Sequence, residues 1–99
     1  MTSYQDMISQ LSVDLVTYRK RSDRLMLRVP DEKAGYYDLH VRWERKFRKV
    51  ERFLKVLRGK EIDLDMANRR YLKMRKLLEG INYQMNELDR LLINMESGE

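Results

Sequence analysis

Residues 36–60, YYDLHVRWERKFRKVERFLKVLRGK, combine an apolar stripe with a dense set of cations in one predicted helix. The apolar and aromatic positions recur at alternating spacings of four and three, which places them on one side of an α-helix. They are Tyr36, His40, Trp43, Phe47, Val50, Leu54 and Leu57. Leu39 and Phe53 lie beside this stripe and widen it, so we expect the helix to pack against two neighbours.

The segments before and after this helix show the same heptad-like spacing. In the first segment the stripe consists of Tyr4, Ile8, Leu11, Leu15, Tyr18, Ser22 and Leu25. In the third segment it consists of Ala67, Tyr71, Met74, Leu78, Ile81, Met85, Leu88, Leu92 and Met95. Helices are predicted over about 3–28, 33–58 and 64–96. Their similar lengths and short connections predict a single all-α domain over residues 1–99, an antiparallel three-helix bundle with coiled-coil-like packing.

Local signals mark the predicted helix ends. Ser3 with Asp6, or Thr2 with Gln5, is a capping arrangement for the first helix. Pro30 ends that helix because the residue before a proline is pushed out of the α region. We expect Gly59 to be the left-handed cap of the second helix, and an aspartate, Asp63 or Asp65, to cap the third. Four methionines are expected to fill the core. They are Met66, Met74, Met85 and Met95.

The composition excludes several kinds of site. The chain has no cysteine and one histidine, so disulfides and thiolate metal sites are excluded. His40 is expected to pack in the core or at an interface, and we expect no metal and no cofactor. No apolar run approaches the roughly 20 residues of a membrane span, and the N-terminus lacks the pattern of a signal peptide. We therefore expect a cytoplasmic protein with no membrane partner.

Positive charge is concentrated between Arg19 and Lys76, and the chain carries 21 lysines and arginines against 16 acidic residues. Clustered cations bind phosphate backbones mainly by releasing counterions, without reading sequence. The residues predicted to bind nucleic acid are Arg42, Arg45, Lys46, Arg48, Lys49, Arg52, Lys55, Arg69, Arg70 and Lys73. Single-stranded DNA is the favoured ligand. The alternative is an adaptor or inhibitor whose basic face docks an acidic protein.

An interpretation without a binding function is that these charges form a solvent-exposed helix face, stabilised by ion pairs between residues four positions apart. The pairs in question are Asp38 with Arg42, Glu44 with Arg48, and Glu51 with Lys55. Such pairs would compensate only three of the nine cations in residues 42–60. The remaining cations would have no acidic partner within the helix.

Aromatic residues near cations raise the question of base stacking. Trp43 and Phe47 belong to the apolar stripe and are expected in the core. Tyr37 and Tyr83 fall outside their stripes and are the better candidates for contacting bases.

An enzyme is not expected. Small helical chorismate mutases bind a dicarboxylate through arginines and a lysine, but Arg19, Arg42 and Lys49 do not reproduce their spacing. No glycine-rich, Ser-His or paired-carboxylate motif accompanies these residues.

Two stretches resemble the UvsY-type recombination mediators of tailed phages. Residues 29–51, VPDEKAGYYDLHVRWERKFRKVE, form an aromatic and then basic helix after a short break, and residues 67–92, ANRRYLKMRKLLEGINYQMNELDRLL, form a basic and then apolar one. The resemblance implies a small viral protein that forms homo-oligomers and loads a recombinase onto single-stranded DNA in replication or recombination. The chain departs from the family in length, because only LRGK, residues 57–60, stands where the family has a longer middle segment.

Overall fold

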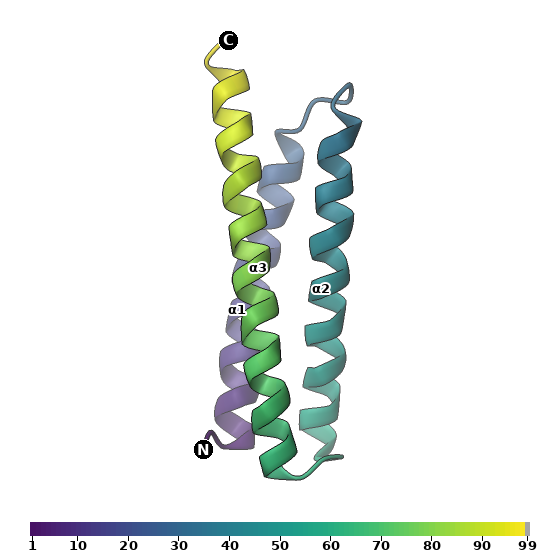
Figure 1. Ribbon diagram of the computed structural model, residues 1–99, viewed down its shortest axis with the longest axis vertical. Coiled ribbons are helices and arrows are strands. Elements are labelled where there is room, and N and C mark those ends of the chain that lie inside the picture. Colours follow the sequence, from purple (N-terminus) through teal and green to yellow (C-terminus); the bar gives the residue numbers. More distant parts are fainter. Residues whose placement is uncertain (99) are drawn as a thin grey trace.

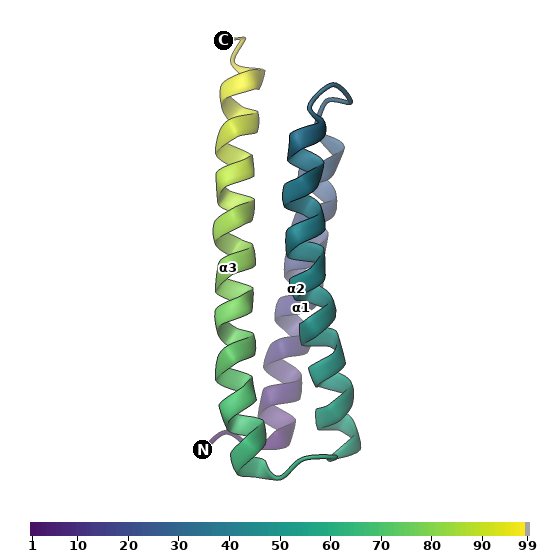
Figure 2. The same ribbon diagram turned by 45° about the vertical axis from the view of Figure 1, so that its right-hand side comes forward.

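The computed structural model describes residues 1–98. It contains three helices, α1 (Tyr4–Leu27), α2 (Ala34–Gly59) and α3 (Leu64–Glu96). They run up, down and up, and each packs against the other two (Figures 1 and 2). The bundle measures 52 × 19 × 17 Å. The predicted all-α, antiparallel three-helix bundle is confirmed.

The helix ends follow the local signals with one exception. The Ser3 hydroxyl accepts a hydrogen bond from the Asp6 amide at 3.1 Å, and the Asp63 carboxylate accepts one from the Met66 amide at 2.8 Å. Gly59 was expected to take the left-handed conformation, but that prediction is wrong. The helix includes Gly59, and Lys60 has the positive φ of 51°. Glycine is still suited to position 59, because a Cβ there would lie 3.0 Å from the Glu61 carboxylate.

The three stripes meet along the bundle axis and form one core. Trp43 and Phe47 are 0% exposed, as predicted, and Phe53 extends the core between α2 and its two neighbours. Met7 also belongs to the core although it lies outside the predicted stripe. Met66 was expected to fill the core and does not, since 41% of it is exposed. It comes one residue before Ala67, which is fully buried, so Met66 lies off the buried stripe of α3.

Two polar contacts fix how α1 sits against its neighbours. The indole Nε1 of Trp43 donates a hydrogen bond of 2.8 Å to the hydroxyl of Ser22, which is fully buried. At the other end of α1, the Tyr4 hydroxyl donates to the Ile62 carbonyl at 2.5 Å. A buried donor without an acceptor is costly, so the Trp43 contact favours one register of α1 against α2.

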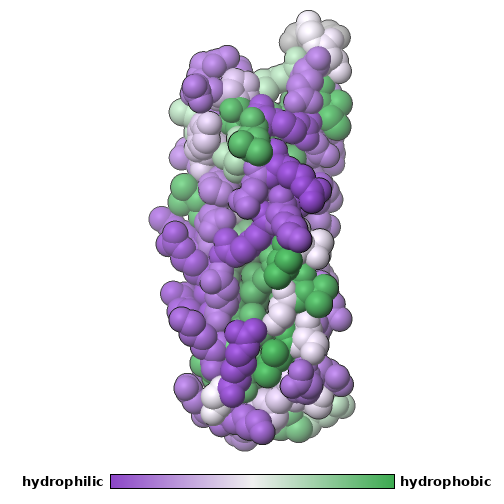
Figure 3. Space-filling view, turned by 180° about the vertical axis from the view of Figure 1, so that it is seen from behind, coloured by the Kyte–Doolittle hydropathy of each residue, from purple (hydrophilic) through white to green (hydrophobic). Residues whose placement is uncertain are grey.

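The face around α1 differs from the rest of the surface. Figure 3 shows apolar residues along the lower half of the side opposite to the view of Figure 1, the side on which α1 lies. Val13 and Val16 of α1 are 61% and 55% exposed. Residues 1–18 carry only two charged side chains, Asp6 and Asp14. The excess of positive charge lies mainly on α2, which carries eight lysines and arginines against three acids.

Candidate nucleic-acid interface

Two of the three acidic residues of α2, Glu44 and Glu51, bind a cation of α1 instead of the cations of their own helix. Arg19 donates hydrogen bonds to Glu44 at 3.3 Å and to Glu51, and its guanidinium lies 4.7 Å from the centre of the Phe47 ring. Burial lowers the pKa of Arg19, but the hydrogen bond that Arg19 donates to Glu51 and the charge of Glu44 outweigh it, so the pKa is raised. Arg19 is therefore a charged residue of the α1–α2 contact.

The interpretation as a solvent-exposed helix face is wrong in its pairing. Glu44 and Glu51 were its main acceptors, and both bind Arg19. Within residues 1–98, no carboxylate lies within 4.0 Å of Arg42, Arg48 or Lys55, the three cations that this interpretation pairs. The outer surface of α2 is consequently less compensated than the sequence indicated.

Arg19 of α1 and Arg28 at its end bind acids of the other two helices, whereas Lys20, Arg21 and Arg24 have no carboxylate within 4.0 Å among residues 1–98. Arg28, the residue that caps α1, binds Asp89 at 2.7 Å and Glu96 at 2.8 Å. Arg75 of α3 binds Asp14, and this hydrogen bond raises the pKa of Arg75 more than burial lowers it. In the described part of the chain, every ion pair between helices thus involves α1 or Arg28. None joins α2 to α3.

The ten predicted site residues differ in their contacts. Arg69 forms an ion pair with Asp65 of its own helix at 3.0 Å. The half-buried Lys46 donates a hydrogen bond to the neutral Gln84 side chain at 3.2 Å. The other eight have no carboxylate within 4.0 Å among residues 1–98, and all eight are exposed. We call the nine residues other than Arg69 the cationic face. It consists of Arg42, Arg45, Lys46, Arg48, Lys49, Arg52 and Lys55 of α2, and Arg70 and Lys73 of α3.

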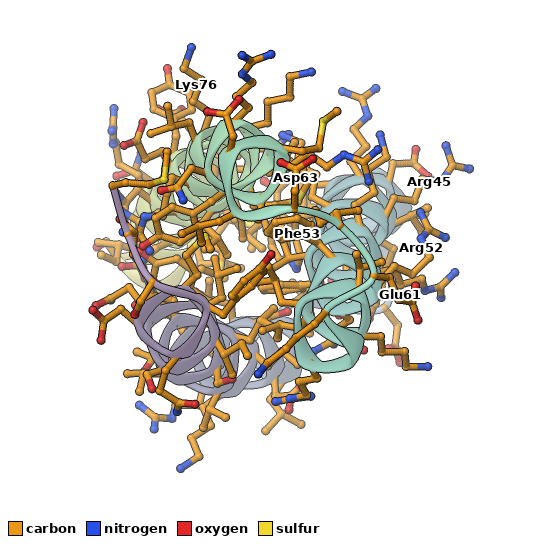
Figure 4. The ribbon with its side chains drawn as sticks, turned by 90° about the horizontal axis from the view of Figure 1, so that it is seen from below. Arg45, Arg52, Phe53, Glu61, Asp63 and Lys76 are labelled. Carbon is orange, nitrogen blue, oxygen red and sulfur yellow. The ribbon has the colours of Figure 1, made fainter. Side chains whose placement is uncertain are left out.

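Most of the cationic face of α2 lies on one side of the helix. Arg42, Arg45, Lys49 and Arg52 follow one another at spacings of three, four and three, so they share that side. In Figure 4, Arg45 and Arg52 project outward from α2, whereas Phe53 points into the bundle. Arg48 and Lys55 are seven residues apart and form a second row beside the first.

Four of the predicted residues come together around a groove between α2 and α3. The groove has a volume of about 420 Å³. Its rim is formed by Lys49 and Arg52 of α2 and by Arg70 and Lys73 of α3. Its floor is apolar and consists of Phe53, Val56 and Met74. We call this feature the cationic groove.

The apolar floor of the cationic groove was not predicted from the sequence. Val56 was assigned no role, and Met74 was assigned to the core. A signal was present for Val56, because it lies four residues after Arg52 and seven after Lys49, on the side of α2 that carries the cations. The sequence did not show that Met74 of α3 lies opposite.

Lys46 reaches across the upper part of the α2–α3 contact. A Cβ at position 80 would lie 3.2 Å from the Lys46 ammonium, so the missing side chain of Gly80 leaves the path to Gln84 open. Glycine inside a helix costs about 1 kcal/mol relative to alanine. At position 80 it leaves room for the Lys46 side chain. At this contact Lys46 has no carboxylate within 4.0 Å among residues 1–98.

The aromatic candidates lie outside the groove. Tyr37 is 37% exposed in the first turns of α2, and Tyr83 is 67% exposed on α3. Neither lines the cationic groove. His40 is half-buried, lies edge-on to Trp43, and approaches Glu44 at 3.5 Å. Among residues 1–98, no three His, Asp or Glu side chains are placed to hold a metal ion.

A membrane-spanning helix needs about 20 predominantly apolar residues. None of the helices within residues 1–98 has the length and apolar character needed to cross a membrane.

The chain is thus a three-helix bundle with a cationic face and an apolar-floored groove on its α2–α3 side. No model of a known protein family matches it, and neither curated proteins nor solved structures include one that is significantly similar. We therefore infer its function from the geometry of the site.

Proposed function

We propose that this protein binds nucleic acid through its cationic face, without catalysis and without reading base sequence, and that single-stranded DNA is its preferred ligand. The observation that supports the proposal most directly is the direction of Glu44 and Glu51. Because both acids bind Arg19, the outer surface of α2 keeps its positive charge. Phosphates are the anions that such a row of arginines and lysines matches best.

The shape of the bundle favours a single strand over a duplex. Proteins that read duplex DNA insert one helix into a major groove about 12 Å wide. Here the cations are shared by two packed helices in a bundle 19 Å by 17 Å across. Contact through two packed helices does not match the insertion of one helix into such a groove. A single strand can follow the cationic face along its length, as it does in positively charged channels.

The role in replication or recombination, the homo-oligomer and the recombinase partner are further parts of this proposal. They rest on the sequence resemblance to the UvsY-type mediators. The exposed Val13 and Val16 of α1 support the self-association, because they lie away from the cationic face and leave it free.

Fluorescence anisotropy with labelled single-stranded DNA, duplex DNA and RNA at low salt tests the proposal. We expect the single strand to bind most tightly and its affinity to fall steeply when salt is doubled. The double variant Arg45→Glu/Lys49→Glu is expected to abolish binding. The matched control Lys20→Glu/Arg24→Glu makes the same change in net charge on exposed positions of α1 and is expected to bind.

Circular dichroism shows whether each variant keeps its helices. If none of the three nucleic acids binds the unmodified protein at low salt, the proposal is wrong. The alternative expected from the sequence, an interaction module that docks an acidic protein through the same cations, then takes its place.

A further inference from the structure

The cationic groove has a feature that phosphate binding does not require, namely its apolar floor. Phosphates need only cations. Arg48 and Lys55, the second row of cations on α2, do not line the groove and its apolar floor. In the groove, Phe53 is buried with 5% of its surface exposed, and Val56 and Met74 are half-buried. An apolar surface with charged walls indicates a ligand that is flat and apolar in the middle and anionic at its edges.

The dimensions of the floor limit what this ligand is. Phe53 and Val56 are three residues apart, which is about 4.5 Å along α2, and among residues 1–98 α3 adds only Met74 to the floor. An acidic amphipathic helix places apolar side chains at positions i, i+3 or i+4, and i+7, and so needs an apolar groove of two turns or more. The floor is too short for that. Its length suits a single planar ring.

The walls suit a nucleobase in particular. Arg52 and Arg70 lie on opposite sides of the groove, and guanidinium planes stack on unpaired bases. The Met74 thioether can contact the edge of an aromatic ring. Lys49 and Lys73, each three residues from the arginine of its own helix, are placed to contact the phosphates on either side of that base.

We propose that the cationic groove holds one unpaired nucleobase of the bound strand, with its two flanking phosphates on the rim. This inference rests on the proposed function, because it presupposes that a nucleic-acid strand lies on the cationic face. It also supplies a physical reason for a preference for single strands. In a duplex the base is stacked and paired, and must first be extruded at a cost in free energy.

The test compares two labelled strands with the same number of phosphates. One is oligo-dT of about 12 nucleotides, within the range of site sizes for charged channels. The other replaces every nucleotide by an abasic deoxyribose. We expect the abasic strand to bind about tenfold more weakly, in the range measured for the stacking of one base. The two strands should show the same salt dependence, because their phosphate contacts are the same.

Variants then assign the effect to the groove. Val56→Phe fills the floor and keeps all four cations, so it should bring oligo-dT down to the affinity of the abasic strand and leave the abasic affinity unchanged. Val41→Phe, on the same helix but outside the groove, is the matched control and should keep the tenfold difference. Met74→Gln replaces the thioether with a polar amide of similar length, and serves as a second groove variant if Val56→Phe does not fold.

Each result bears on one of the two proposals. Equal affinity of the unmodified protein for the two strands overturns the base site and leaves phosphate binding by the cationic face in place. Loss of the tenfold difference in Val41→Phe as well as in Val56→Phe overturns the assignment to the groove. If neither strand binds at low salt, the nucleic-acid function itself is wrong, and the base site falls with it.

Discussion

Neutralising two cations of the α2 row gives a quantitative test of where the charge acts. Arg45→Gln/Lys49→Gln removes two side chains that have no carboxylate within 4.0 Å among residues 1–98. Six cations share the groove side of the bundle. They are Arg42, Arg45, Lys49, Arg52, Arg70 and Lys73. Because neither altered residue packs in the core, we expect no change in fold.

The magnitude follows from counterion release. If all six cations contact phosphates, the slope of log K against log salt for a single strand is about −4.2, and removing two of them reduces it to about −2.8. Doubling the salt concentration should then weaken binding by about 18-fold for the unmodified protein and about sevenfold for the variant. Anisotropy titrations at four or five salt concentrations separate these slopes.

The control is Lys20→Gln/Arg24→Gln, which removes the same charge from exposed positions on α1. At about 0.1 M salt the Debye length is about 10 Å, so charges on the far side of the bundle contribute little to binding. The control should keep the steeper slope. Equal slopes for the two double variants would mean that the protein attracts nucleic acid through its net charge, and the assignment to the cationic face would be refuted.

Two polar contacts and the outer surface of α1 give further predictions. Ser22→Ala should lower the free energy of unfolding by about 1–2 kcal/mol, because it leaves the buried Trp43 Nε1 without its acceptor; denaturation in urea measures this, and the exposed Ser9→Ala should show no such loss. The hydrogen bond from Arg28 lowers the pKa of Glu96, so its stabilisation is present above pH 4.5, the ordinary value, and is lost as the pH falls through the lower folded value. Glu96→Gln should therefore destabilise the protein at pH 7 but not in strong acid, and an equal loss at both pH values would contradict this origin. Light scattering should give a mass above that of one chain, whereas a monomer at all concentrations would contradict the self-association.

The periodicity of the sequence was sufficient to predict the bundle. Burial alternates every three or four residues along all three helices, so the apolar stripes gave the elements and most of the core. The positions of Trp43 and Phe47 were predictable for this reason, because an aromatic residue within a stripe must face the neighbouring helices. The end of α2 was less predictable. A glycine near a helix end predicts the left-handed residue to within one position, and here that residue is Lys60.

The partners of charged residues were not predictable from local spacing. From the sequence, Glu44 has Arg48 one turn away and Glu51 has Lys55 one turn away, and these pairs are as plausible as any other. In the structure both acids bind Arg19, which lies on another helix and is half-buried against Phe47. A buried guanidinium needs a carboxylate more than an exposed one does, since water no longer solvates it. The register of α1 against α2 therefore decides the charge of the outer surface of α2.

The same reasoning explains why the groove could not be predicted. Its rim needs Lys49 and Arg52 to face Arg70 and Lys73, which depends on how far α3 is shifted along α2. The sequence shows four cations in two pairs, but not that the pairs share one groove. The spacing of Lys49 and Arg52 predicts only that these two residues lie on the same side of α2.

The distribution of ion pairs gives the α2–α3 contact a different character from the other two. Acids and bases meet where α1 contacts its neighbours, through Arg19, Arg28 and Asp14. Between α2 and α3 the side-chain hydrogen bonds run from Lys46 to Gln84 and from the Tyr36 hydroxyl to the Met95 sulfur, and the cations around the groove repel one another. In the unbound protein this repulsion opposes the packing of the apolar floor beneath it. A polyanion bound on the rim, as we propose, would remove the repulsion and bind only the folded state, so its binding would also stabilise the bundle. Because the acids of α2 pair with Arg19, the α2–α3 side keeps an excess of positive charge.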